Sequence, residues 1–581
     1  MTDQEHAPAP LTGIVGLGSV GEELLTLLYA AGHRIVAVDT DLDVLARVGR
    51  RLKALDDGRA DAPEVVLTAD HSLLRPAQAV VEAVPEDATA KARALRQVAE
   101  AVPPGTPLLT TTAGLPLLSL ALASGRPEDL AGLRLFTPPA ADGPVEPVRT
   151  PLTSEAAAEA ADRLVAAAGL RPVAVGAGPA ADATALVLGL LNGAVALYDE
   201  GYAAHHEIDT AMRLGCGLAL GPLEMLDHIG LDTAHAALSE LRRTTGDPLF
   251  APAGLLTRMV AAERLGRKSG EGFYAYDETG ARLAPADEPS AAAEARPVRL
   301  VGVVGSGTMA CGIAESVATA GRPVVLVART AGKAERARQS VDASLARAVH
   351  RGRRTEEQRD AALALLESTD DAGRLADCDL VIEAVAEDLD VKRRVFAELG
   401  ARCAPGALLA TTTSSLSVAA CERAAGRPGD VVGIHFFNPA PLMRLVELVR
   451  TDTVRPQALA TAEGFCRSLG KTPVTCPDRT GFIVNSLLFP YLGAAMTLLE
   501  RRGAGAEETD AAVQQGFGYP MGPFTLLDTI GLDVSLAIQD RLFEHFGTPE
   551  HEPSPALRQL VAAGFLGRKN RRGLRTAGPR S

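Results

Sequence analysis

A histidine and a glutamate twelve positions apart, His435 and Glu447, are the residues in this chain that best fit acid–base chemistry. A carboxylate beside an imidazole fixes the tautomer and the orientation of the ring, and the other ring nitrogen can then exchange a proton near neutral pH. A lone histidine at the end of a strand is more often structural. The pair therefore predicts a proton-transfer site only if the surrounding segments bring the two side chains together.

The segments around the pair predict such a contact. Residues 431–436 form a short apolar run, which is typical of a buried strand in a parallel sheet. Two prolines then interrupt the ladder and turn the chain into a loop. A second β-rich run follows at 445–449. His435 would thus end one strand, and Glu447 would lie in the middle of the next.

The chain repeats itself at a fixed offset. AVVEAVPEDATAK begins at residue 79, and LVIEAVAEDLDVK begins 301 positions later. GPLEMLDHIGLD and GPFTLLDTIGLD are separated by the same offset, as are VEPVRT and VELVRT. The glycine-rich loops near the two starts differ by only 289 positions. The second copy is therefore longer, and we place its additional residues in the charged stretch 351–369.

Each copy divides into two parts. Apolar strands alternate with helical stretches in the first part, and the second part is almost wholly helical in pattern, including one long helix over 479–502. We therefore expect an α/β Rossmann-type nucleotide-binding domain plus an all-α helical domain, the pair being repeated twice. The predicted domains are residues 11–180 and 181–283 in the first copy, a linker at 284–297, and residues 298–478 and 479–581 in the second copy.

The glycine loop of the first copy follows a strand and precedes a helix. Its glycines are Gly16, Gly18 and Gly21, and a second strand ends at Asp39. Glycines allow the backbone to approach a pyrophosphate at the helix N-terminus, and the acidic residue accepts hydrogen bonds from the ribose hydroxyls. The first copy thus carries a complete fingerprint for NAD.

The loop of the second copy differs at the position that selects the cofactor. It contains Gly305, Gly307 and Ala310, and Ala328 replaces the acidic residue, followed by Arg329 and Thr330. Loss of the carboxylate removes the repulsion of a 2′-phosphate, and a guanidinium can pair with that phosphate. The sequence favours NADP(H) in this copy. The alternative is that NAD binds there without the ribose contact.

HFFNPAPLMRLVELV, which contains the His–Glu pair, resembles the active-site segment of the 3-hydroxyacyl-CoA dehydrogenases, including the twelve-residue spacing. The resemblance covers essentially both copies. It implies a nucleotide-binding domain followed by a helical domain that makes the dimer contact in this family. Two helical domains in one chain would then pack together as an intramolecular pseudo-dimer.

The same resemblance implies roles for residues of the second copy. His435 would be the acid–base and Glu447 would orient it, while Ser414 and Asn485 would position and polarise the C3 oxygen of the substrate. Glu387 and Lys392 would face the nicotinamide end of the cofactor. The sequence departs from the family in one position of this set, because Thr412 replaces the asparagine that precedes the T-S-S segment.

The first copy lacks most of this set, and we expect it to be catalytically inactive. We place Leu135 at the histidine position and Pro138 at the asparagine of F-N-P. Only Glu146 is retained, and the remaining replacements are Ala113, Gly114 and Thr184. Two roles stay open for this copy: binding NAD through its intact fingerprint, or serving only as a packing partner.

Composition excludes several other classes. A formal charge of −14 argues against a nucleic-acid surface. The seven cysteines show no regular spacing, so they are expected to be reduced thiols, with no zinc or other metal site. We find no signal-peptide pattern and no apolar run that predicts a membrane span. A cytoplasmic location is expected.

The sequence therefore predicts an oxidoreductase that interconverts 3-hydroxyacyl and 3-oxoacyl thioesters with NAD(P), the chemistry residing in the second copy. One alternative is the same reaction on a substrate bound to an acyl carrier protein instead of coenzyme A. Another is a non-catalytic nucleotide-binding descendant of the family. Further association into a homo-oligomer is left open.

Overall fold

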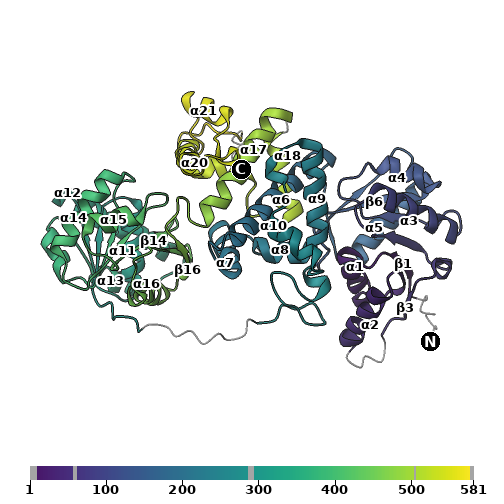
Figure 1. Ribbon diagram of the computed structural model, residues 1–581, viewed down its shortest axis with the longest axis horizontal. Coiled ribbons are helices and arrows are strands. Elements are labelled where there is room, and N and C mark those ends of the chain that lie inside the picture. Colours follow the sequence, from purple (N-terminus) through teal and green to yellow (C-terminus); the bar gives the residue numbers. More distant parts are fainter. Residues whose placement is uncertain (1–8, 57–61, 285–293, 503–504, 576–581) are drawn as a thin grey trace.

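The computed structural model describes residues 9–56, 62–284, 294–502 and 505–575. Most of the predicted linker, residues 284–297, lies outside the described residues. Two sheet-containing domains flank a central group of helices, as Figure 1 shows. This arrangement confirms the predicted fold class, two α/β domains that are each followed by a helical domain.

The first α/β domain is an eight-stranded sheet with the order β3-β2-β1-β4-β5-β6-β7-β8. Its strands are β1 (Leu11–Val15), β2 (Arg34–Val38), β3 (Val65–Thr68), β4 (Ala79–Glu82), β5 (Leu108–Thr110), β6 (Leu130–Leu135), β7 (Pro144–Val148) and β8 (Arg171–Pro172). Its helices are α1 (Ser19–Ala30), α2 (Leu42–Asp56), α3 (Ala88–Ala101), α4 (Leu117–Ser124) and α5 (Glu155–Ala167).

The second α/β domain repeats this order as β11-β10-β9-β12-β13-β14-β15-β16. Its strands are β9 (Val301–Val304), β10 (Val324–Val327), β11 (Leu366–Thr369), β12 (Leu380–Glu383), β13 (Leu408–Thr411), β14 (Val431–Phe436), β15 (Leu445–Arg450) and β16 (Thr472–Pro477). Its helices are α11 (Thr308–Thr319), α12 (Ala331–His350), α13 (Glu356–Ala364), α14 (Leu389–Arg402), α15 (Val418–Ala425) and α16 (Pro456–Ser468). Helix α13 lies in the stretch where the additional residues were predicted.

The strands of both sheets pair in parallel, as predicted, except at one pair in the described part of each sheet. β7 runs antiparallel to β6, and β15 runs antiparallel to β14. The reason is the length of the connection, because residues 437–444 are too few for a crossover that returns the chain in the same direction. The short loop makes a hairpin, and the hairpin places His435 directly opposite Glu447.

Each helical domain contains five α-helices in its described part. They are α6 (Ala177–Asp199), α7 (His205–Cys216), α8 (Pro222–Ile229), α9 (Leu231–Thr245) and α10 (Gly254–Ala261) in the first copy, and α17 (Val484–Arg502), α18 (Ala506–Phe517), α19 (Pro523–Ile530), α20 (Leu532–Phe546) and α21 (Pro555–Ala562) in the second. The long helix predicted over 479–502 begins only at Val484, because Gly481 and Phe482 have positive φ angles of 85° and 49°. Pro490 lies inside this helix.

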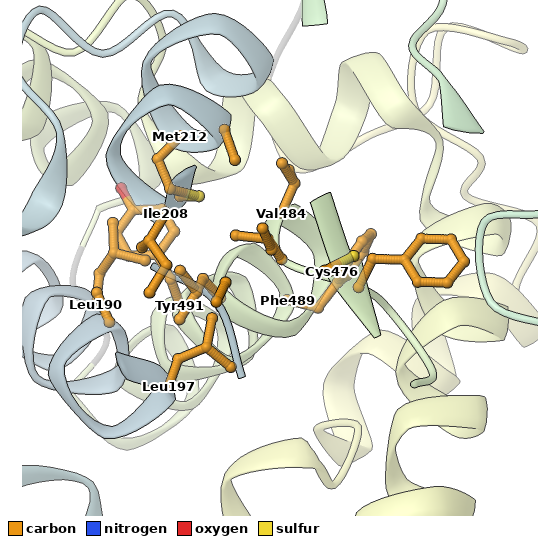
Figure 2. Close-up of a cluster of buried hydrophobic side chains, with 14 of the residues drawn as sticks. Leu190, Leu197, Ile208, Met212, Cys476, Val484, Phe489 and Tyr491 are labelled. Carbon is orange, nitrogen blue, oxygen red and sulfur yellow. The ribbon is translucent and has the colours of Figure 1, made fainter. Parts of the chain in front are cut away.

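The two helical domains pack against each other in the centre of the molecule. Helix α6 contacts both α17 and α18, and their apolar side chains belong to one continuous core. Figure 2 shows part of this core, with residues from both copies in one cluster. The labelled side chains are Leu190, Leu197, Ile208 and Met212 from the first copy, and Cys476, Val484, Phe489 and Tyr491 from the second.

Each sheet also contacts the helical domain of the other copy. β7 contacts α18, and β15 and β16 contact α7, which occupies the position of α18 in the repeat. The Tyr202 hydroxyl donates a hydrogen bond to the Pro477 carbonyl at 2.9 Å, and the rings of Phe136 and Phe517 meet edge to face at 5.8 Å. The two copies are therefore held together by reciprocal contacts.

Helix α6 is long and apolar enough to cross a membrane by length and composition alone, which the sequence reading did not anticipate. In the structure, 72% of the most apolar 18-residue stretch of this helix is buried inside the protein. Its apolar residues are accounted for by packing against α17 and α18. All seven cysteines are unpaired, and six of them are buried.

Replacement of Leu487 tests the contact between the two central helices. This side chain of α17 is 5% exposed and packs against Gly193 of α6. We expect Leu487→Ala to lower the free energy of unfolding by about 2–5 kcal/mol, because it leaves a cavity in the shared core. Leu442, which is 57% exposed, supplies the control, and Leu442→Ala should change stability by less than about 0.5 kcal/mol. Equal effects in urea unfolding would contradict the packing described here.

Candidate active site

The His435 and Glu447 side chains meet at the end of the β14–β15 hairpin. They are a register pair of the antiparallel ladder, and Nδ1 of His435 lies 2.6 Å from Oε2 of Glu447. The histidine is 5% exposed and the glutamate is fully buried. Because the carboxylate can only accept, Nδ1 carries the proton, and Nε2 of the neutral ring is left as an acceptor.

The second oxygen of Glu447 connects the sheet to the helical domain. Oε1 accepts hydrogen bonds from the backbone N–H groups of Ile483 at 3.0 Å and Val484 at 2.9 Å. These groups lie at the N-terminus of α17, where unpaired backbone donors favour a negative charge. A buried carboxylate is thus stabilised and cannot rotate away from His435.

Ser414 completes a chain of three side chains. Its hydroxyl lies 3.0 Å from Nε2 of His435, on the opposite side of the ring from Glu447. The segment that carries Ser414 is held by Glu387, whose Oε1 accepts from the Thr413 hydroxyl at 2.6 Å and from the Ser414 N–H at 3.0 Å. Burial alone would raise the pKa of Glu387, but the Lys392 ammonium, the bonds from Thr413 and Ser414 and the Arg541 guanidinium outweigh it. The pKa of Glu387 is therefore held below its ordinary value.

Lys392 does not reach an open surface. It is 1% exposed, and Nζ bonds both oxygens of Glu383, at 2.8 and 2.9 Å. Its distance to Glu387 is 3.5 Å. Lys392 thus lies next to Glu387, and its ammonium group contacts the carboxylates of Glu383 and Glu387.

Asn485 lies in the first turn of α17, one residue beyond the N–H groups that bind Glu447. It is 8% exposed, and within the described residues its side chain makes no hydrogen bond to the other three candidates. The structure therefore joins His435, Glu447 and Ser414 and leaves Asn485 nearby. Sequence reasoning missed two aromatic neighbours of the imidazole, Phe437 at 4.6 Å and Phe482 at 5.5 Å between ring centroids.

The glycine loop of the second copy leads from β9 into α11. Gly305 has φ of +141°, and a Cβ there would lie 2.4 Å from the Ala384 carbonyl oxygen, so only glycine fits. At Gly307 nothing lies within 4 Å of such a Cβ. This open space at the N-terminus of α11 fits a pyrophosphate. Ala310 is buried within the core at the start of the helix.

The residues that follow β10 lack an acidic side chain. Ala328 is buried, whereas Arg329 is exposed, and its guanidinium has no partner among the described residues. The Thr330 hydroxyl caps α12 by accepting from the Lys333 N–H. Arg329 is therefore the residue of this segment that is free to bind a ligand.

The corresponding loop of the first copy retains its acidic residue. Oδ2 of Asp39 accepts from the Leu17 N–H at 2.7 Å, and Gly18 faces open space as Gly307 does. Gly21 is required here, because a Cβ would lie 1.9 Å from the Gly16 carbonyl oxygen. The loop also contacts its own helical domain, since the Ser19 hydroxyl donates to the Ile229 carbonyl at 3.0 Å.

The structure corrects the placement of two residues in the first copy. Arg134, not Leu135, is opposite Glu146 in the β6–β7 ladder, and it forms an ion pair with that glutamate. The same offset puts Thr137, not Pro138, at the asparagine position. Shifting the alignment of a strand by one residue assigns each side chain to the opposite face of the sheet. The neighbouring FTPP segment made this shift hard to recognise in the sequence. A cation that cannot deprotonate thus occupies the imidazole position.

The two domains of the first copy are joined by a different set of ion pairs. Glu22 and Glu23 of α1 bind arginines of α2 and of the segment after α10, and these groups surround a cavity of about 210 Å³. The pairs are Arg47–Glu22 at 2.9 Å, Arg51–Glu22 at 2.9 Å, Arg51–Glu23 at 3.1 Å and Arg267–Glu23 at 2.9 Å. Because most of these charges are paired with each other, the network acts as a connection between domains.

No cluster of three or more His, Cys, Asp or Glu side chains in the described part of the chain could hold a metal ion. The side chains brought together at the candidate site are Ser414, His435 and Glu447. The fold and this site define a class: a protein with a Rossmann-type domain, whose buried histidine–glutamate pair is stabilised by a helical domain.

Comparison with known families identifies the chain more narrowly. Residues 12–178 and 300–479 match the family described as 3-hydroxyacyl-CoA dehydrogenase, NAD binding domain. Residues 183–276 and 481–577 match 3-hydroxyacyl-CoA dehydrogenase, C-terminal domain. The chain belongs to the 3-hydroxyacyl-CoA dehydrogenase family of oxidoreductases and contains both domains in two tandem copies.

Individual relatives cover about half of the chain. A 3-hydroxybutyryl-CoA dehydrogenase of Mycobacterium tuberculosis is 45% identical over 281 residues, which are 48% of this chain and 98% of the relative. The mitochondrial hydroxyacyl-coenzyme A dehydrogenase of Homo sapiens is 39% identical over 293 residues, or 49% and 93% of the two chains. A crystal structure of 3-hydroxybutyryl-CoA dehydrogenase from Escherichia coli K12 covers 96% of this chain and 100% of its own, with a TM-score of 0.55 and 21% identity. That likeness concerns the fold alone.

The tautomer of His435 should depend on the two oxygens of Glu447. In Glu447→Gln, one amide oxygen must serve both the α17 N–H groups and Nδ1. We expect it to stay with the two backbone donors and to present NH₂ to the ring, which moves the ring proton to Nε2. Nitrogen-15 NMR of histidine-labelled protein reports the tautomer. An Nδ1–H tautomer in both proteins would contradict this description.

Proposed function

We propose that the chain interconverts 3-hydroxyacyl and 3-oxoacyl thioesters, and that the second copy alone performs the chemistry. The observation that carries this proposal is the Ser414–His435–Glu447 chain, with distances of 3.0 and 2.6 Å. The first copy has an Arg134–Glu146 ion pair at the corresponding place and Ala113 at the position of Ser414. Family membership supports the reaction type.

The proposed roles follow from these contacts. When bound, NAD(P) supplies the acceptor or donor of a hydride at C3. In the oxidation direction Nε2 of His435 takes the proton of the C3 hydroxyl, and in the reduction direction it returns the proton to the oxygen. Glu447 stabilises the imidazolium, since one of its oxygens already accepts from Nδ1. Ser414 and Asn485 position and polarise the C3 oxygen.

The substrate that we propose is a short acyl thioester of coenzyme A. The support is that two relatives more than 38% identical are named for coenzyme A substrates, and one of them is named for the 3-hydroxybutyryl thioester. Reduction of acetoacetyl-CoA by purified protein, followed through nicotinamide absorbance, tests this. Turnover of an acyl-carrier-protein thioester alone would favour the carrier-protein alternative. No turnover of either would favour the non-catalytic alternative.

We further propose that the second copy prefers NADP(H), although the matching domain is described as NAD-binding. Ala328 cannot repel a 2′-phosphate, and Arg329 is exposed beside it without a protein partner among the described residues. NADP(H) as cofactor favours reduction of the 3-oxo thioester in the cell. The first copy acts in this proposal as the packing half of an intramolecular pseudo-dimer.

Matched substitutions in the two copies test the division of labour. His435→Gln should lower kcat by about 10²–10⁴-fold, because general acid–base catalysis contributes a factor of that order. Arg134→Gln, at the corresponding position of the first copy, should leave kcat unchanged. Steady-state rates with acetoacetyl-CoA provide the measurement. A parental rate in His435→Gln, or a similar loss in both variants, would show that the chemistry is placed wrongly.

Arg329 supplies the test of cofactor preference. Arg329→Ala should raise KM for NADPH about tenfold or more, as expected for loss of a charged hydrogen bond, and should leave KM for NADH unchanged. Arg336, also exposed and further along α12, provides the control. Arg336→Ala is expected to change neither value. A parental protein that prefers NADH would refute the preference for NADP(H).

A further inference from the structure

Arg541 of α20 joins the second helical domain to the segment that carries Ser414. Nη1 donates to the Ser415 hydroxyl at 2.8 Å, and Nη2 donates to the Glu387 carbonyl oxygen at 3.1 Å. Nη1 also lies 3.9 Å from a carboxylate oxygen of Glu387. The guanidinium therefore contacts both residues that flank or hold Ser414.

These contacts exist in only one of the two copies. The offset of the repeat places Glu240 at the position of Arg541, and Gly114 at the position of Ser415. The Glu240 carboxylate instead forms an ion pair with Arg243 of its own helix, with 2.6 Å between Oε1 and Nη2. Glycine has no hydroxyl to accept a hydrogen bond. The donor and its acceptor side chain are thus both missing from the copy that lacks the His–Glu pair.

Glu387 links Arg541 to the segment that carries Ser414, and these contacts are called the Arg541 bridge. Within the α/β domain, Lys392 lies 3.5 Å from the Glu387 carboxylate, and Thr413 and Ser414 donate hydrogen bonds to its Oε1. From the helical domain, Arg541 binds the Glu387 backbone carbonyl and the Ser415 hydroxyl. Glu387, which holds residues 413 and 414, is therefore contacted by two charged groups that come from different domains.

We propose that Arg541 is a positioning residue for the reaction of the second copy. It docks α20 on the loop after β13 and holds the Ser414 hydroxyl in line with Nε2 of His435. This role rests on the proposed function, because it assigns Arg541 to the same site. The residue acts through Ser415 and Glu387 and does not itself exchange a proton.

The first test does not depend on activity. Hydrogen exchange is measured by mass spectrometry on the full chain of the parent, Arg541→Met and Arg558→Met. Arg558 is the matched control, because it is an exposed arginine of the same domain and, among the described residues, its side chain binds Asp540 alone. In Arg541→Met the amides of residues 413–416 should exchange about tenfold faster, since two charge-assisted bonds are lost. Unchanged exchange, or equal acceleration in Arg558→Met, would overturn the proposal.

The second test is a double-mutant cycle on turnover. Arg541→Met should lower kcat/KM for acetoacetyl-CoA by about 10- to 100-fold, and Ser415→Ala by a smaller factor. The double variant should lose less than the product of the two factors, because the residues share one hydrogen bond. Arg541→Lys should recover part of the loss. The dissociation constant of NADPH alone should change much less than kcat/KM, because the glycine loop is not touched and the Glu387 carboxylate keeps its bonds from Thr413 and Ser414.

The outcomes separate this inference from the proposed function. Purely multiplicative losses, or a loss in Arg541→Met confined to NADPH binding, would overturn the positioning role. A parent that is inactive on both thioesters would remove the proposed function, and the exchange experiment would then decide whether Arg541 orders residues 413–416. Accelerated exchange in an inactive parent would retain the bridge as a structural contact and overturn its role in catalysis.

Discussion

The hydrogen bonds of the Glu447 carboxylate are the interactions on which the candidate site of the second copy depends. One of its oxygens orients the His435 ring, and the other accepts two N–H groups from the start of α17. A buried carboxylate without such donors would be costly, so the contact between the sheet and the helical domain stabilises the His435–Glu447 pair. The three side chains Ser414, His435 and Glu447 all belong to the α/β domain, and the helical domain supplies the backbone donors that stabilise the carboxylate.

The first copy has a similar arrangement with a different partner for the glutamate. Glu146 also accepts two backbone N–H groups, those of Val175 and Gly176, while its other oxygen binds Arg134. The Arg134 guanidinium neutralises the charge of Glu146, whereas a neutral imidazole leaves the corresponding glutamate charged, and unlike an imidazole a guanidinium does not release a proton. The contact between the sheet and the helical domain is thus present in both copies, although the residue opposite the glutamate differs.

Much of this could be predicted from the sequence, because the informative patterns are local or repeated. The hairpin residues His435 and Glu447, the strand–glycine–helix loops and the 301-residue offset all lie in short segments. The direction of β15 was missed because it depends on the length of a loop. Arg134 was misplaced by one residue, and that error exchanged the two faces of β6. The contact of Arg541 with Ser415 joins residues 126 positions apart, so no local pattern shows it, although comparison with Glu240 singles it out.

We expect the substrate to react beside His435 in the second copy. A crystal structure of the chain with oxidised cofactor and a 3-hydroxybutyryl-CoA analogue measures this directly. The account predicts that the C3 oxygen lies within about 3 Å of Nε2 of His435 and of the Ser414 hydroxyl. A C3 oxygen bound beside Arg134, or one held away from His435 by the helical domain, would contradict it.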